Sequence, residues 1–192
     1  MPIVVDHAAA RQRIADLAAG IVATEGVGAL TMRRVAEASG ASRSIVSTYF
    51  TGMYDLLLAT FESAADRQAA RFEAAVGRSA RLEECLETLL PLDAGRLRDW
   101  RVIIAYLGMS VADPELAAIE RRRIDGARRR VDALLVRDRG LPRGTAETRR
   151  DARTLVALVL GIAVDVAFEP GSVPTPMARR RLKDALRSFP AR

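Results

Sequence analysis

The chain of 192 residues contains few of the residues from which catalytic and metal sites are built. It has one cysteine, Cys85, and one histidine, His7. A single cysteine excludes an internal disulfide and is typical of a reducing compartment, so we expect a cytoplasmic protein. Acidic neighbours of Cys85 are expected to raise the pKa of its thiol and to weaken it as a nucleophile.

Several other signals are absent. The sequence has no glycine-rich phosphate loop and no residues at metal-ligand spacing, so we expect no catalytic residues, no metal, no cofactor and no enzyme activity. No apolar run approaches the roughly 18 residues of a membrane span, and we expect no membrane partner. The N-terminus lacks a basic start followed by a long apolar stretch, so we expect no secretory signal.

The charge is basic and comes almost wholly from arginine, since Lys183 is the only lysine among 30 basic residues. The 24 acidic residues leave a net charge of +6. In residues 1–52, however, five arginines stand against four acidic side chains, which leaves only +1. Charge therefore agrees with a nucleic-acid partner without establishing one.

Residues 31–50 have the pattern of a helix-turn-helix. Thr31 can cap the first helix through its side-chain oxygen, and Gly40 interrupts the helix where the chain must turn. Ser42 can cap the second helix, and two short helices joined by a glycine-containing turn form this DNA-binding motif.

The second helix of the motif has two different faces. Ile45, Val46 and Tyr49 are spaced to form one apolar face against the first helix. The other face carries short polar groups and one long cation, which suit a DNA major groove: Arg43, Ser44, Ser47 and Thr48.

With these residues in order, segment 11–57 resembles the DNA-binding domain of the TetR family of bacterial transcriptional regulators. The matching positions are Gly26, Thr31, Ala36, Gly40, Ser42, Tyr49, Phe50, Leu56 and Leu57. The resemblance implies a set of DNA-contacting residues: Thr31, Arg33, Arg34, Ser42, Arg43, Ser44, Ser47, Thr48, Tyr49 and Met53. Among them, Arg43 is expected to read a guanine edge, because its guanidinium fork matches the O6/N7 pair.

Two positions depart from the commonest form of the family. Ser47 stands where many members have tyrosine, and the run 45–50 resembles the subgroup of choline–betaine pathway repressors, which has serine there. Met53 stands where most members have lysine, so one cationic phosphate contact is lost. The free N–H groups of the helix that Met53 begins can still bind a phosphate.

The rest of the pattern predicts an all-α protein of about nine helices. Besides the motif, helices are expected over these ranges: 8–25, 53–76, 80–90, 95–112, 114–139, 146–168 and 176–189. We expect a three-helix DNA-binding head over 1–52 and a helical bundle for effector binding and dimerisation over 53–192. Residues 113–116 and the end of the 146–168 helix also resemble the betaine-type subgroup, although that subgroup has Asp-Gly where this chain has Leu160-Gly161.

The helix 146–168 is apolar almost all round, so both of its sides must be covered. One side can pack on its own body and the other on a partner subunit, as the family resemblance implies. The residues expected at a homodimer interface are Leu155, Leu158, Val159, Ile162, Val166, Leu182, Leu186 and Phe189. A fully internal helix in a monomer is the alternative.

A ligand pocket among the body helices is also implied by the resemblance. A plausible apolar lining with two polar handles is offered by Phe61, Leu89, Trp100, Ile103, Tyr106, Leu107 and Met109; simple core packing is the alternative. For Asp165, the alternatives are a buried, partnered carboxylate and the wet edge of an interface. The arginine blocks 121–123 and 128–130 indicate a solvated face partly paired with Glu115, Glu120 and Asp125; the alternatives are a site for an anionic effector and a secondary DNA contact.

Together these features predict a sequence-specific DNA-binding transcriptional regulator, a repressor released from a pseudo-palindromic operator by a small-molecule effector. The alternative is a helical small-molecule binding module whose head has weakened or lost DNA binding, as Met53 and the low charge of the head suggest.

Overall fold

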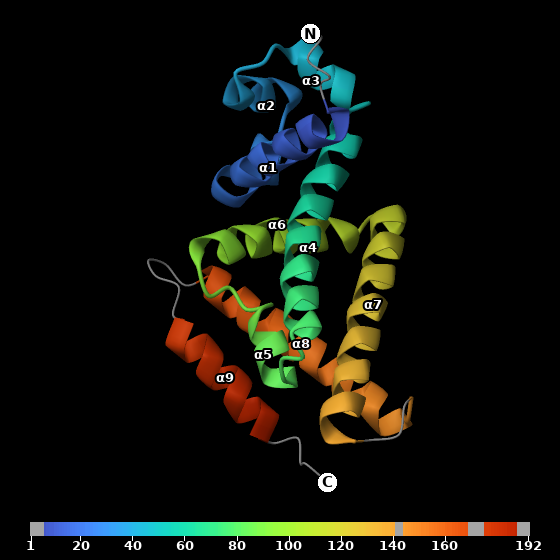
Figure 1. Ribbon diagram of the computed structural model, residues 1–192. Coiled ribbons are helices and arrows are strands. Elements are labelled where there is room, and N and C mark those ends of the chain that lie inside the picture. The colour runs from blue at the N-terminus through green and yellow to red at the C-terminus, as the bar shows by residue number, and fades with distance from the viewer. Residues whose placement is uncertain (1–5, 141–143, 169–174, 188–192) are drawn as a thin grey trace.

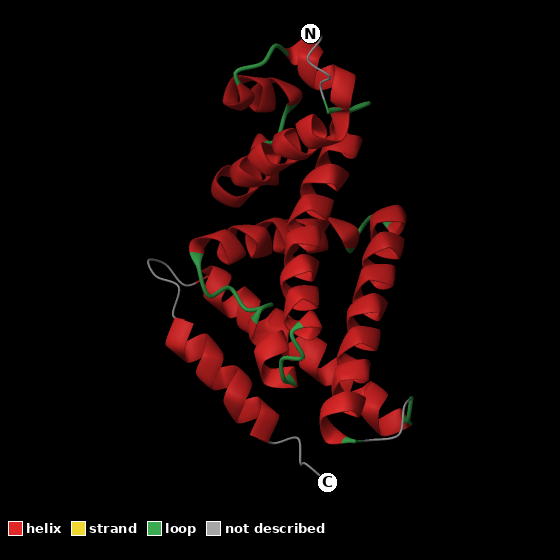
Figure 2. Cartoon of the chain, viewed as in Figure 1, coloured by secondary structure: helices red, strands yellow, loops and turns green. Residues whose placement is uncertain are grey.

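The computed structural model describes residues 6–140, 144–168 and 175–187. Within these ranges the chain forms nine α-helices, one 3-10 turn and no strand. Figure 2 shows helices joined by loops. The predicted all-α fold and its number of helices are confirmed. None of the described helices is long and apolar enough to cross a membrane.

The head contains three helices, whose ends are set by the predicted caps. They are α1 (His7–Glu25), α2 (Met32–Ser39) and α3 (Arg43–Tyr49), with the 3-10 turn Val27–Ala29 between the first two. The Thr31 side chain accepts a hydrogen bond from the Arg34 amide (3.0 Å), and the Ser42 side chain accepts one from Ile45 (3.3 Å). Gly40 ends α2 at φ 67°, a left-handed conformation that favours glycine.

One long helix, α4 (Met53–Gly77), connects the head to the body (Figure 1). It begins beside α3 and runs down through the centre of the molecule, where α6 crosses it. The first helix packs against both α4 and α6. The proposed division between residues 52 and 53 therefore stays a prediction, since α4 is continuous from one part to the other.

The body consists of five further helices. They are α5 (Leu82–Glu87), α6 (Ala94–Ser110), α7 (Pro114–Arg139), α8 (Ala146–Phe168) and α9 (Thr175–Arg187). Asp93 and Asp113 cap α6 and α7 through their side chains. Pro114 stands at the first position of α7, where a backbone N–H would have no partner within the helix and its absence costs nothing. Only α5 is clearly shorter than predicted, because the residues after Glu87 form turns before Pro91.

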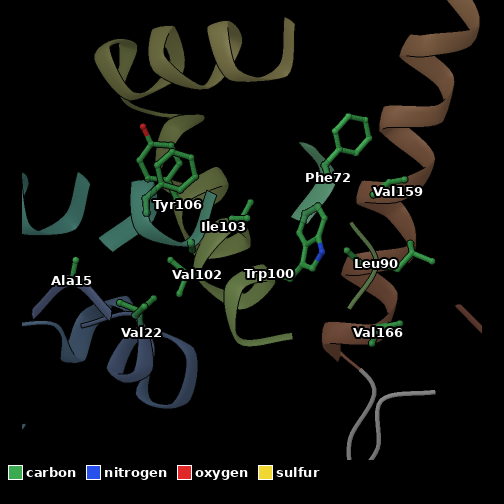
Figure 3. Close-up of a cluster of buried hydrophobic side chains, with 14 of the residues drawn as sticks. Ala15, Val22, Phe72, Leu90, Trp100, Val102, Ile103, Tyr106, Val159 and Val166 are labelled. Carbon is green, nitrogen blue, oxygen red and sulfur yellow. The ribbon is translucent and has the colours of Figure 1, made fainter. Parts of the chain in front are cut away.

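The core is continuous from head to body. Figure 3 shows Ala15 and Val22 of α1 at one end, Trp100 and Ile103 of α6 in the middle, and Val159 of α8 at the other end. All five are buried. A continuous apolar core joins the position of the head to the packing of the body.

Candidate nucleic-acid interface and ligand cavity

The recognition helix α3 has one fully buried side chain and presents most of its other side chains outward. Val46 is 0% exposed and packs into the core with Phe50. Arg43, Ser44, Ser47 and Thr48 are exposed, as predicted. Ile45 was expected on the inner face, but it is 49% exposed. That expectation was wrong, because Val46 alone occupies the centre of the buried side and Ile45 lies about 100° away around the helix.

The hydroxyl groups of α3 are already hydrogen-bonded within the helix. Ser47 Oγ donates to the Arg43 carbonyl (3.0 Å), and Thr48 Oγ1 donates to the Ile45 carbonyl (2.7 Å). In this arrangement each hydroxyl directs its one proton to a carbonyl of its own helix and presents acceptor lone pairs to a base amino group.

The three arginines predicted to contact DNA differ in how free they are. Arg43 makes no ion pair with a described residue, and Arg33 is 84% exposed with only a distant Glu37 at 3.8 Å. Arg34 pairs with Glu25 through two hydrogen bonds (2.7 and 3.2 Å), and this pair lowers the pKa of Glu25. Arg34 uses its Nε and Nη2 in the pair with Glu25 and keeps Nη1 for a phosphate, whereas the whole guanidinium group of Arg43 is available.

An arginine that the sequence reasoning missed positions the recognition helix. Arg11 of α1 donates to the carbonyl of Tyr49, the last residue of α3, and pairs with Asp55 of α4 (2.5 Å). Its guanidinium also lies 4.4 Å from the centre of the Phe50 ring. Arg11 therefore joins three helices at the C-terminal end of α3, where free carbonyls need donors.

Asp55 completes this junction from the other side. Its carboxylate accepts hydrogen bonds from the amide of Thr51 (2.9 Å) and from Arg11. These hydrogen bonds, from Arg11 above all, hold the pKa of Asp55 below its ordinary value. The turn between α3 and α4 is thus fixed by a charged pair, and no local sequence pattern predicts a contact between residues 44 positions apart.

The N-terminus of α4 is a second place for a phosphate. Gly52 precedes this 25-residue helix and provides no side-chain cap, so its first N–H groups have no side-chain partner. Met53 is 39% exposed beside them. Tyr49 is half-buried, with its ring 5.4 Å from the ring of His7. Backbone donors and the helix dipole can hold a phosphate here without the missing lysine.

The body contains a cavity of about 400 Å³ between α4, α6, α7 and α8. Its apolar wall includes Phe72, Leu89, Trp100, Val131 and Val159. Figure 3 shows the Trp100 indole between Phe72 and Leu90, and its Nε1 donates to the Leu89 carbonyl (2.6 Å). A mostly apolar cavity of this size can hold a small organic molecule.

The cavity takes in only two of the seven residues predicted to line it. Leu89 and Trp100 are in its wall, and the other five lie outside it. Phe61 and Tyr106 stack on each other with ring centres 3.7 Å apart, and both are buried. Burial, with the nearby Glu120 carboxylate, raises the pKa of Tyr106 to about 12. These aromatics are core, the alternative that the sequence left open.

The polar part of the cavity was not predicted. Gln68 and Glu120 are only 6% and 5% exposed. Glu120 is paired with Arg123 at 2.6 Å, while the amide nitrogen of Gln68 has no partner among the described residues. The remaining charged residues of the wall are Asp66, Arg122, Arg128 and Arg130. The wall thus offers both hydrogen-bonding groups and charges of both signs to a ligand.

An ion network around one buried carboxylate connects this region to the head. Asp99 of α6, which is 1% exposed, accepts hydrogen bonds from Arg67 (2.7 Å) and Arg71 (3.0 Å) of α4. Arg67 also contacts the carboxylate of Asp16 in α1. Two residues of the network are adjacent in sequence to residues of the cavity wall: Asp99 precedes Trp100, and Arg67 precedes Gln68. The network therefore extends from the cavity wall to the first helix of the head.

The residues predicted at the dimer interface lie mostly inside the single chain. Leu155, Val159, Ile162, Val166 and Leu182 are buried, Leu158 and Leu186 are partly buried, and Phe189 lies outside the described residues. The buried ones already pack against their own subunit. The exposed side of α8 carries Ala157, Gly161, Asp165 and Phe168 instead.

The charged positions that the sequence left open are now placed. Asp165 is exposed to solvent and pairs with Arg181 of α9 at 2.6 Å, so it is not a buried carboxylate. In the arginine blocks, Arg128 pairs with Asp125 at 3.0 Å and Arg123 with Glu120, as expected. Glu115 instead accepts a hydrogen bond from Tyr54 (3.4 Å), and Arg130 pairs with Glu73.

Two family models match the chain. One describes bacterial regulatory proteins of the tetR family and matches residues 14–60, and the other describes the C-terminal domain of BetI-type transcriptional repressors and matches residues 78–191. The comparison with curated proteins gives no match.

Solved structures of transcriptional regulators have the same fold. A regulator from Rhodococcus sp. Rha1 is 26% identical with a TM-score of 0.81, covering 93% of this chain and 94% of that one. A putative regulator from Saccharomonospora viridis, in complex with choline, is 22% identical with a TM-score of 0.74, covering 94% and 96%.

The multidrug binding protein EbrR, complexed with malachite green, is 25% identical with a TM-score of 0.61, covering 91% of this chain and 96% of that one. The second family model spans more than half of this chain, and the first contains the whole helix-turn-helix. The chain therefore belongs to the TetR family of bacterial DNA-binding transcriptional regulators, with a C-terminal domain of the BetI type.

Proposed function

We propose that the protein is a repressor that binds a pseudo-palindromic operator as a twofold dimer and leaves it when a small molecule fills the cavity. The observation that carries this proposal is the path of α4. The helix begins at the recognition helix, where Asp55 holds Arg11, and its middle forms a wall of the cavity through Gln68 and Phe72. A displacement of α4 at the cavity is transmitted along this helix to the head.

The dimer supplies the geometry of repression. Two recognition helices related by a twofold axis fit half-sites separated by one or more turns of DNA. We place the interface on the exposed side of α8, with α9. A Cβ at Gly161 meets no atom within 4 Å, so a larger side chain there leaves the subunit fold undisturbed.

That property allows a matched test of the dimer by sedimentation velocity. Gly161→Arg is expected to halve the sedimenting mass, while Ala70→Arg, at an exposed position of α4, adds the same charge and leaves the dimer intact. A wild-type monomer at micromolar concentration, or an unaffected Gly161→Arg dimer, would contradict the interface.

Ligands seen in the relatives support a binding role for the body. One relative was solved with choline and another with malachite green. In this chain the cavity suits a small, partly apolar molecule. The ligand can release DNA only to the extent that it binds the displaced arrangement more tightly than the DNA-bound one.

Selection of bound genomic fragments by the purified protein at physiological salt, followed by footprinting, tests the DNA-binding part. We expect one enriched palindrome, and Arg43→Ala should lower affinity for it by about 1–3 kcal/mol and relax one base position. An absence of enrichment above salt-sensitive, non-specific binding would reject the repressor and favour a small-molecule binding module with a degenerate head.

A further inference from the structure

The only large apolar side chain exposed on the described surface of α3 is Ile45, at 49% exposure. It stands among Arg43, Ser44 and Thr48, which are all exposed and polar. Val46 packs α3 into the core and Arg11 holds its C-terminal end, so Ile45 is not needed to hold α3 in place.

We propose that Ile45 is a specificity-determining residue that contacts the C5-methyl group of a thymine in the major groove. The inference rests on the proposed operator binding of the head. Of the four bases only thymine presents an apolar group in that groove, and an exposed aliphatic side chain on a helix that enters the groove can recognise it.

The other side chains of α3 leave this role unfilled. Arg43 donates and suits guanine. Ser47 and Thr48 have spent their hydroxyl protons on the carbonyls of Arg43 and Ile45, so they accept from the amino groups of adenine or cytosine. Apart from the single methyl group of Thr48, the other exposed side chains of this face, Arg43, Ser44 and Ser47, end in polar groups. Ile45 presents the largest apolar surface of the face and is the side chain best suited to a thymine methyl.

The contact also gives a role to an isoleucine side chain that is exposed to water in the unbound protein. Leaving an apolar side chain in water is unfavourable, and docking against a methyl group removes both surfaces from water at once. One buried methyl group strengthens a complex by a factor of about four.

Replacement of thymine by deoxyuridine in the selected operator tests the proposal directly, because it removes only the methyl group. Each thymine of one half-site is replaced in turn, and affinity is measured by fluorescence anisotropy. For the wild type we expect one position at which deoxyuridine weakens binding about fourfold. For Ile45→Ala, the same replacement should have no effect, and Ile45→Val should fall between the two.

Leu17→Ala is the matched control, since Leu17 is also an exposed aliphatic side chain of the head, at 40%, but lies on α1. It should keep the full sensitivity to deoxyuridine. If the wild type binds its operator and every deoxyuridine replacement is neutral, or if Ile45→Ala stays equally sensitive, Ile45 does not read thymine and the repressor proposal stands. If no operator is selected at all, both proposals fail.

Discussion

Replacement of Arg11 by methionine should show how firmly the recognition helix depends on its anchor. Arg11→Met keeps a side chain of similar length but removes the contact with the Tyr49 carbonyl, the pair with Asp55 and the position over the Phe50 ring. The seven-residue α3 is too short to be stable by itself, so it depends on such contacts. We expect the end of α3 to fray and operator affinity to fall.

The magnitude follows from the contacts. Hydrogen bonds to charged groups contribute about 1.5–3 kcal/mol each, and partial exposure of Arg11 and Asp55, at 37% and 27%, reduces this by screening. The three interactions share one side chain and do not add. The loss should therefore be about 2 kcal/mol, which lowers the melting temperature by about 4–8 °C in a protein of this size.

The control for this experiment is Arg13→Met. Arg13 is an exposed arginine of the same helix that makes no ion pair with a described residue, so its replacement removes the same charge without touching the anchor. Thermal unfolding, operator affinity and amide exchange of α3 should separate the two variants. Equal melting temperatures and equal affinities for Arg11→Met and Arg13→Met would show that Arg11 acts only through its charge, and would refute the anchor.

Three further predictions concern single groups. The pKa of Asp55 is lower in the folded protein than in the unfolded chain, so its pair with Arg11 stabilises the fold above about pH 4. This contribution is lost as the pH falls through the folded pKa. Asp55→Asn should therefore flatten that part of an acid-unfolding curve. Asp99→Asn should lower the unfolding free energy by about 3–5 kcal/mol in urea titrations, because two guanidiniums lose a buried counter-charge; a change below 1 kcal/mol would contradict the network. Burial raises the pKa of the Cys85 thiol, so a thiol reagent should modify the native protein only as fast as it opens; rapid labelling of folded protein would place Cys85 at the surface.

The local features of the fold could be predicted from the sequence because their causes are local. Thr31, Ser42 and Asp113 cap helices through bonds to amides two or three residues away, and the observed helices begin at the residues after them. Gly40 takes the left-handed conformation that the turn needs. Each of these effects is complete within about one turn of helix.

The features that the sequence did not predict depend on contacts between distant residues. A helix apolar all round gives no indication of which side faces its own subunit, and the buried positions of Leu155 and Val159 settle this for α8. Spacing placed Ile45 beside Val46 on an apolar face, although the partner helix covers only one of them. Likewise, Arg11 and Asp55 meet only because α1 lies beside the junction of α3 and α4.

The contacts of the ion network predict that α1 moves together with α4 if a ligand in the cavity displaces α4. Arg67 holds Asp16 of the head and Asp99 of the body at the same time, and Asp99 is too deeply buried for water to replace a lost partner. Breaking such a contact costs several kcal/mol, whereas tilting α4 together with α1 keeps it intact. Because Arg11 and Asp55 hold α3 to both α1 and α4, rotation of the whole head is the response to a displaced α4 that costs the least free energy. In the proposed repressor, a ligand that prefers the displaced state by a few kcal/mol would therefore move the recognition helix out of register with its half-site.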